Sequence, residues 1–111
     1  MSIYKNLVVD QGQTFTYTIS VENADGTPKD LTNYTIASQM RKTYFSSTAI
    51  DFDTAKVDLT GAVTISLTAA VSSEIKQGRY VYDVEITSGD EVLRVQEGII
   101  IVTPQVTRAA E

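Results

Sequence analysis

The feature of this sequence that most constrains its fold is a strict alternation of apolar and polar side chains across residues 14–21. Phe15, Tyr17, Ile19 and Val21 take one set of alternating positions, and threonine and serine take the other. Because successive side chains of a β-strand point to opposite faces of a sheet, the pattern predicts a strand with one buried face. The same period recurs at residues 35–41, 62–67 and 79–87, so we predict an all-β chain.

Turn-forming sequences separate the predicted strands. Residues 23–30 combine Asp-Gly, which supplies a positive φ, with Pro28, which cannot join a hydrogen-bonded ladder. A second turn is predicted at residues 88–90, before a returning strand at residues 91–102. Seven or eight short strands at this spacing are typical of an antiparallel β-sandwich of immunoglobulin-like type. The chain has no Cys and no Trp, so the conserved core of antibody domains is absent.

The other predicted strands are less regular. A loop followed by a short strand is predicted at residues 49–52, and strands at residues 56–59 and 62–67 are predicted to pair around residues 60–61. In the last strand the alternation is interrupted at residues 97–98, where a glycine follows a glutamate. Because glycine within a strand often marks a β-bulge, we predict one at that point.

One short helical turn is predicted near residues 69–76. Thr68 can cap the run that follows it, and Gly78 is placed to end the helix in the left-handed conformation. Val71 and Ile75 lie four residues apart, so they are predicted to pack together on the edge of the sandwich.

The length of the chain fits one domain. At 111 residues it is long enough to bury a core without cross-links. We predict a single β-sandwich domain with an N-terminal extension over residues 1–103 and a polar C-terminal tail over residues 104–111. The first residues lack the apolar run of a signal peptide, so we expect a soluble protein without one.

Composition argues against several classes of function. Without histidine or cysteine there is neither a conventional hydrolytic triad nor the usual zinc site. A net charge of −5 disfavours binding to nucleic acid and to anionic membranes. A sandwich of this size offers little cleft, and no pair of carboxylates is set apart by the pattern. We therefore expect no enzymatic activity, no cofactor and no small-molecule substrate.

Two motifs allow a functional and an ordinary interpretation. Asp51 and Asp53 flank Phe52 and are the weak candidates for a Ca²⁺ site, although their spacing is not that of an EF-hand. The alternative is a strand whose aspartates face solvent around a buried Phe52. Asn33 begins a glycosylation sequon, in which Tyr34 is more simply explained as an anchor in the core.

Exposed aromatic residues are the best candidates for an interface. Most aromatic side chains fall on the apolar faces of predicted strands, but Tyr4, Tyr44 and Phe45 lie outside clear strands. Aromatic residues exposed in this way are enriched in protein interfaces. Pro104 and Val106 complete the set of candidates, because they lie where the chain is predicted to leave the last strand.

Several segments carry a resemblance to a known family. They are residues 10–15 (DQGQTF), 24–35 (ADGTPKDLTNYT), 39–44 (QMRKTY), 78–84 (GRYVYDV), 97–98 (EG) and 103–107 (TPQVT). In this order the chain resembles small immunoglobulin-like β-sandwich proteins of tailed bacteriophages, including T4-like cyanophages, over nearly its whole length. It resembles more loosely the N-terminal sandwich of phage upper-baseplate proteins. The matching residues determine the fold, so the resemblance assigns no functional residue.

The resemblance implies a non-enzymatic structural or accessory role in a virion. We expect a subunit or adaptor of the tail, baseplate or neck, made in the host cytoplasm, with other virion proteins and copies of itself as partners. The termini and the sheet edges are the surfaces expected to assemble. The alternatives are a capsid decoration protein and a carbohydrate- or host-surface-binding module with Tyr44, Phe45 and Phe52 as its platform.

Overall fold

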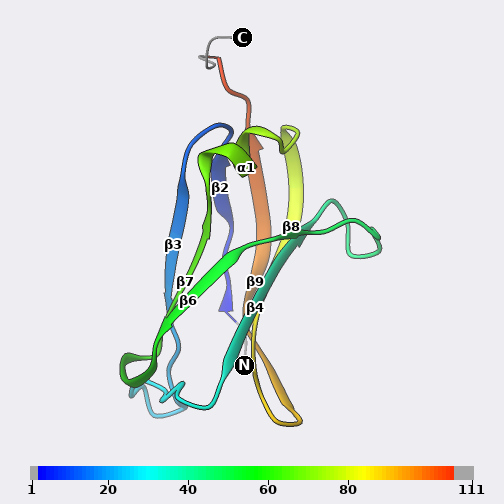
Figure 1. Cartoon of the computed structure of the whole chain (residues 1–111). Helices are drawn as coiled ribbons and strands as arrows, with labels where there is room; N and C mark the ends of the chain where they lie inside the picture. The colour runs from blue at the N-terminus through cyan, green and yellow to red at the C-terminus, as the bar shows by residue number, and fades with distance from the viewer. Residues whose placement is uncertain (1–2, 107–111) are drawn as a thin grey trace.

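The computed structural model describes residues 3–106 and shows two β-sheets packed face to face (Figure 1). The larger sheet has the order β1-β9-β8-β4-β5, with β2 also paired to β9. Its strands are β1 (Ile3–Tyr4), β2 (Leu7–Asp10), β4 (Thr35–Arg41), β5 (Ile50–Asp51), β8 (Gly78–Ser88) and β9 (Glu91–Thr103). The smaller sheet has the order β3 (Phe15–Ser20), β7 (Ala62–Leu67) and β6 (Asp53–Val57). The predicted all-β sandwich is confirmed, with nine strands among the described residues where seven or eight were expected.

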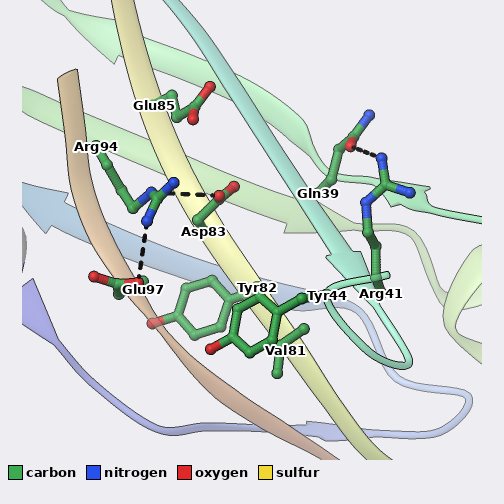
Figure 2. A pocket seen from close by; sticks show the side chains of 9 residues that line it. All are labelled: Gln39, Arg41, Tyr44, Val81, Tyr82, Asp83, Glu85, Arg94 and Glu97. Atoms are coloured by element: carbon green, nitrogen blue, oxygen red, sulfur yellow. Dashed lines mark hydrogen bonds and ion pairs between the residues drawn. The ribbon is translucent and has the colours of Figure 1, made fainter. Parts of the chain in front are cut away.

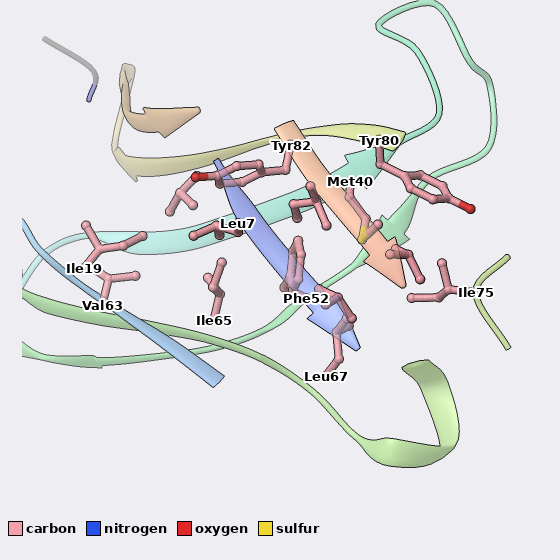
Figure 3. Packing of buried hydrophobic residues seen from close by; sticks show 14 of the residues in the cluster. Leu7, Ile19, Met40, Phe52, Val63, Ile65, Leu67, Ile75, Tyr80 and Tyr82 are labelled. Atoms are coloured by element: carbon pink, nitrogen blue, oxygen red, sulfur yellow. The ribbon is translucent and has the colours of Figure 1, made fainter. Parts of the chain in front are cut away.

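The core lies between the two sheets and is built from the alternating positions (Figure 3). The inward side chains of β3, β7 and β8 are the ones that the alternation selected, and Val63, Ile65, Val84 and Ile86 are fully buried. Phe52 lies where the chain leaves β5 in one sheet for β6 in the other, and its N–H donates to the Ser38 carbonyl at 3.0 Å. The Phe52 side chain is buried between the sheets, which confirms the predicted burial.

The N-terminal segment is part of the larger sheet rather than an extension. Ile3 pairs with Gln96, and Leu7 pairs with Ile100, both in parallel with β9. Leu7 and Val9 point inward and are buried, so this segment closes one side of the core. This pairing also makes the larger sheet mixed, whereas an antiparallel sandwich was predicted. Sequence alternation identifies a strand but not its partner, which here lies 93 residues away.

The position of the N-terminal strands leaves one edge of the smaller sheet open. In seven-stranded immunoglobulin domains the sheet order is ABED, so the first strand pairs with the second. Here β1 and β2 pair with β9 in the opposite sheet, and β3 stands at the end of the order β3-β7-β6. Among residues 3–106, only β7 pairs with β3.

Two tyrosines on β8 make hydrogen bonds, partly or fully buried, that the sequence did not reveal. The Tyr80 hydroxyl donates to the carbonyl of Lys76 at 2.8 Å, which is the geometry of the tyrosine corner of immunoglobulin-like domains. The Tyr82 hydroxyl donates to the carbonyl of Lys5 at 2.7 Å and accepts from the Gln96 amide at 2.9 Å. Burial raises the pKa of both phenols above the ordinary value. Tyr82 thereby ties the N-terminal strand segment to β8 and β9.

The helical turn is present, but two of its predicted details are wrong. Helix α1 spans Ala69–Ser73, and the Thr68 hydroxyl caps it by accepting from the Val71 N–H at 3.2 Å. Ile75 is buried in the core as predicted, but Val71 is exposed. Within the helix Ser72 is buried instead, and its hydroxyl donates to the Gln13 carbonyl at 2.7 Å. Helix α1 has five residues, which are too few to form a continuous apolar face, and Ser72 is the one residue of this helix that is buried. Gly78 opens β8 and does not end the helix.

Two strand details also differ from the prediction. The strand expected at residues 56–59 is β6, which ends at Val57 and is followed by a short 3-10 helix at Asp58–Thr60. The bulge in β9 lies beside Val95, because Val84 pairs with Gln96 while Glu85 pairs with Arg94. It precedes the predicted position, and after it the phase of β9 is reversed. Gln96 and Ile100 consequently point inward, and Ile99 and Ile101 point outward.

Candidate functional site

The outer face of the larger sheet carries apolar side chains where a solvated sheet face normally carries polar ones. After the bulge, β9 presents Ile99 and Ile101 on this face, and the paired residues of β8 and β2 add Val81 and Val8. The outer face of the smaller sheet is ordinary by comparison, since threonine, serine and alanine dominate it. We call the first of these surfaces the apolar patch, and its members are Tyr4, Val8, Tyr44, Val81, Ile99 and Ile101.

Two of the predicted interface residues come together in the apolar patch. Tyr4 and Tyr44 are 40 residues apart in sequence, and both line a shallow hollow of about 310 Å³ whose floor includes Val81 and Ile99. Tyr4 is 63% exposed and Tyr44 is 68% exposed, so both rings remain available to a partner. Tyr4 reaches this face because its strand pairs in parallel with β9, opposite Glu97.

The loop between β4 and β5 presents a third aromatic ring. Phe45 is 97% exposed, the most exposed of the large apolar side chains between residues 3 and 106. Two hydrogen bonds of Ser46 order the loop: Arg41 Nη1 donates to the Ser46 carbonyl at 2.6 Å, and the Ser46 N–H donates to the Thr43 carbonyl at 3.2 Å. A loop that is already ordered loses less conformational entropy on binding.

A charged cluster adjoins the apolar patch on the same face (Figure 2). Arg94 lies between two carboxylates, with Nε 3.6 Å from Asp83 Oδ2 and Nη1 3.4 Å from Glu97 Oε1. Asp83 and Glu97 lie directly opposite each other on β8 and β9, a placement that is unfavourable for like charges. Partial burial raises the pKa of Asp83; Glu97 adds to the rise, and Arg94 opposes it. The face therefore holds a carboxylate whose charged form is disfavoured mainly by its partial burial.

Relative to the natural chain, the Asp83→Asn variant should gain stability as the pH rises from acidic to neutral. Because the pKa of Asp83 is higher in the folded state, its contribution to stability is complete below the unfolded pKa and is lost as the pH rises through the folded pKa. Asparagine stays neutral, so the difference in unfolding free energy between the variant and the natural chain should shift in favour of the variant between pH 3 and pH 7. Urea titrations at both pH values measure this difference, and an unchanged or reversed difference would contradict the assignment.

The metal candidates Asp51 and Asp53 do not converge. They lie on β5 and β6, which belong to different sheets, and Asp51 accepts a hydrogen bond from the Gln39 amide at 2.7 Å. Both are exposed around the buried Phe52, as in the solvent-facing interpretation. Among residues 3–106, no three His, Cys, Asp or Glu side chains gather closely enough to hold a metal ion.

Pro104 and Val106 follow β9, which ends at Thr103, and so lie beyond Ile101 of the apolar patch along the chain. Figure 1 shows the chain leaving the end of β9. Both are exposed, and the segment is held by the Gln105 N–H, which donates to Gln11 Oε1 at 3.0 Å. The predicted tail beyond Val106 lies outside the described residues. Tyr34 of the sequon packs partly against the core, and its hydroxyl donates to Glu91 at 2.7 Å.

Sequence reasoning missed Val8, Val81, Ile99 and Ile101, the aliphatic members of the apolar patch. A signal was present, because Ile99 to Val102 are four consecutive apolar residues, and at least one pair of them must face outward in a strand.

Within residues 3–106, no helix has the length and apolar character needed to cross a membrane.

Comparisons with known proteins bear on the fold. No protein-family model and no curated protein matches the sequence. Among solved structures, InlP of Listeria monocytogenes matches with a TM-score of 0.52 and 12% identity, over 92% of this chain and 28% of that one. A family 123 glycoside hydrolase from Clostridium perfringens matches with a TM-score of 0.41 and 12% identity, over 93% of this chain and 23% of that one. The chain thus spans under a third of either protein, and the likeness to InlP shows a shared β-rich fold alone.

Proposed function

We propose that this chain is a non-enzymatic structural or adaptor domain that binds a partner protein through the outer face of its larger sheet. The observation that carries the proposal is the apolar patch, on which Tyr4 and Tyr44 remain exposed above Val81 and Ile99. Contiguous apolar surface bordered by polar residues marks interaction sites on folded proteins. On the strength of the resemblance alone, we propose that this role is in a virion, in the tail, baseplate or neck.

The charges around the patch support a protein partner. The chain carries a net charge of −5, yet Arg41, Arg79 and Arg94, three of its four arginines, lie on this face. Arginine and tyrosine are enriched in protein interfaces, whereas a solvated surface favours lysine and glutamate. Asp83 is partly exposed on the same face, so its carboxylate can also accept an ion pair from a partner.

A glycan-binding platform is less well supported by the geometry. The rings proposed for it were Tyr44, Phe45 and Phe52, but Phe52 is 5% exposed and packs with Phe15 in the core. This part of the carbohydrate hypothesis is wrong, because Phe52 lies where the chain crosses from β5 to β6 and is buried between the two sheets. A capsid decoration protein differs from the proposed subunit in its location alone, and the same experiment distinguishes the two.

The test is stoichiometric incorporation of a tagged chain into virions or tail assemblies produced from the genome that carries its gene. Tyr4→Ser combined with Tyr44→Ser should abolish incorporation while leaving the melting temperature nearly unchanged, since both rings are exposed. The matched control is Val57→Ser combined with Leu59→Ser, which removes two exposed apolar side chains from the smaller sheet and its adjoining turn. A chain that never copurifies with particles, or a control that fails equally, would refute the proposal.

A further inference from the structure

The open edge of the smaller sheet is a second surface with the chemistry of an interaction site. An edge strand presents a row of unpaired N–H and C=O groups, and natural proteins usually protect it with charged residues, proline or a bulge. Strand β3 has none of these, because residues 11–21 contain no charged residue and no proline, and its register with β7 is continuous. The opposite edge of the same sheet is protected, since β6 carries Asp53 and Lys56.

The direction of the free backbone groups follows from the ladder. The Val21 N–H, one residue beyond β3, donates to the Gly61 carbonyl at 2.8 Å. Hydrogen-bonded and non-hydrogen-bonded positions alternate along an antiparallel pair. The odd-numbered residues of β3 therefore bond to β7, and the backbone groups of Thr16, Thr18 and Ser20 point to the open edge.

We propose that two copies of this chain pair antiparallel through their β3 edges, about a two-fold axis at Thr18, to form a continuous six-stranded sheet. Residues on one face must stay on that face, which requires the paired residues to have the same parity. With Thr18 opposite Thr18, Thr16 meets Ser20 on the outer face. Each pairing agrees with the free backbone groups, so β3 is complementary to itself. An uncharged edge also suits two copies that each carry a net charge of −5.

The inward side of β3 provides an independent reason for this register. Phe15 and Tyr17 face the core but remain partly exposed, so their rings are not fully covered within one copy. Farther along the strand, Ile19 and Val21 line an open groove of about 440 Å³ between the sheets. In the proposed register the partner's Tyr17 lies opposite Ile19, and the partner's Phe15 lies opposite Val21. Aromatic and β-branched residues in such cross-strand positions stabilise each other.

The absence of cysteine allows a direct test by cross-linking. Thr18→Cys gives each chain one thiol at the two-fold axis, where directly opposed residues are about 5.5 Å apart between Cα atoms, within the range of a disulfide. The matched control is Thr64→Cys on β7, because Thr64 lies beside Thr18 on the same face and their hydroxyls are 3.1 Å apart. The two control thiols would be about 14 Å apart across the dimer, from three strand spacings.

Under mild oxidation, the Thr18→Cys variant should form a covalent dimer much faster than the Thr64→Cys variant. In sedimentation equilibrium the natural chain should associate reversibly, and Thr18→Lys should weaken association about fivefold or more, because two like charges would face each other. Thr64→Lys should leave association nearly unchanged. Equal cross-linking rates, a monomer at every concentration, or equal effects of the two lysines would overturn the pairing. The Tyr4 and Tyr44 variants should dimerise normally, so this test is independent of the outer-face proposal.

Discussion

Gly98→Val is expected to destabilise the protein by at least about 3 kcal/mol, since it combines a backbone clash with the loss of a buried hydrogen-bond network. A Cβ at position 98 would lie 2.1 Å from the carbonyl oxygen of Lys5 and 2.8 Å from its carbonyl carbon. That oxygen is also the acceptor for the Tyr82 hydroxyl. The added side chain therefore separates the N-terminal strands from β9, or it unfolds the domain. The midpoint of denaturant unfolding measures the loss.

Gly89→Ala is the control for backbone conformation. Gly89 has a φ of +58°, and nothing lies within 4 Å of its added Cβ, so the substitution should cost about 1 kcal/mol from conformational strain alone. Hydrogen exchange locates the damage in the valine variant. The Lys5 amide, which donates to the Glu97 carbonyl at 2.8 Å, should lose protection first. Equal losses in the two variants would show that the close approach of Lys5 to Gly98 is unimportant.

The parts of the fold that the sequence predicts are those determined by near neighbours. The inward positions of β3 and β8 follow from a period of two, and the Thr68 cap follows from the hydroxyl and the residues just after it. The parallel pairing of Ile3 with Gln96 depends on a partner 93 residues away, which no local pattern specifies. The same holds for the hydrogen bond from Tyr82 to Lys5, 77 residues apart.

Only part of the candidate site can be predicted from the sequence, again because local patterns do not specify distant partners. Tyr4 and Tyr44 were expected to be exposed because the sequence shows no clear strand around them; both are exposed, although Tyr4 lies on β1. Ile99 and Ile101 were missed because they share the odd-numbered phase of the inward-facing Leu93 and Val95, and the bulge beside Val95 moves every following side chain to the other face. The position of a bulge depends on the packing of the partner strand. Consequently the aliphatic half of the apolar patch could be recognised only in the structure.

Phe52→Ala is expected to lower the free energy of unfolding by about 3–5 kcal/mol. Phe52 is buried at the point where the chain crosses from β5 to β6, and its ring lies 5.9 Å from that of Phe15 between ring centroids. The cavity would open between the two sheets, where neighbouring strands are fixed by their ladders and cannot collapse into it. Denaturant unfolding of the purified variant gives the change in free energy.

Substitution of the flanking aspartates distinguishes the two interpretations of residues 51–53, a Ca²⁺ site or a strand whose aspartates face solvent. Asp51→Ala and Asp53→Ala should each change stability by less than about 1 kcal/mol, because both side chains are exposed and Asp51 loses a single surface hydrogen bond from Gln39. Added Ca²⁺ should leave the melting temperature of the natural chain unchanged. A rise in melting temperature that Asp53→Ala abolishes would restore the ion-binding interpretation, since a ligand that binds the folded state must stabilise it. Loss of stability confined to Phe52→Ala would instead show that the motif serves the core.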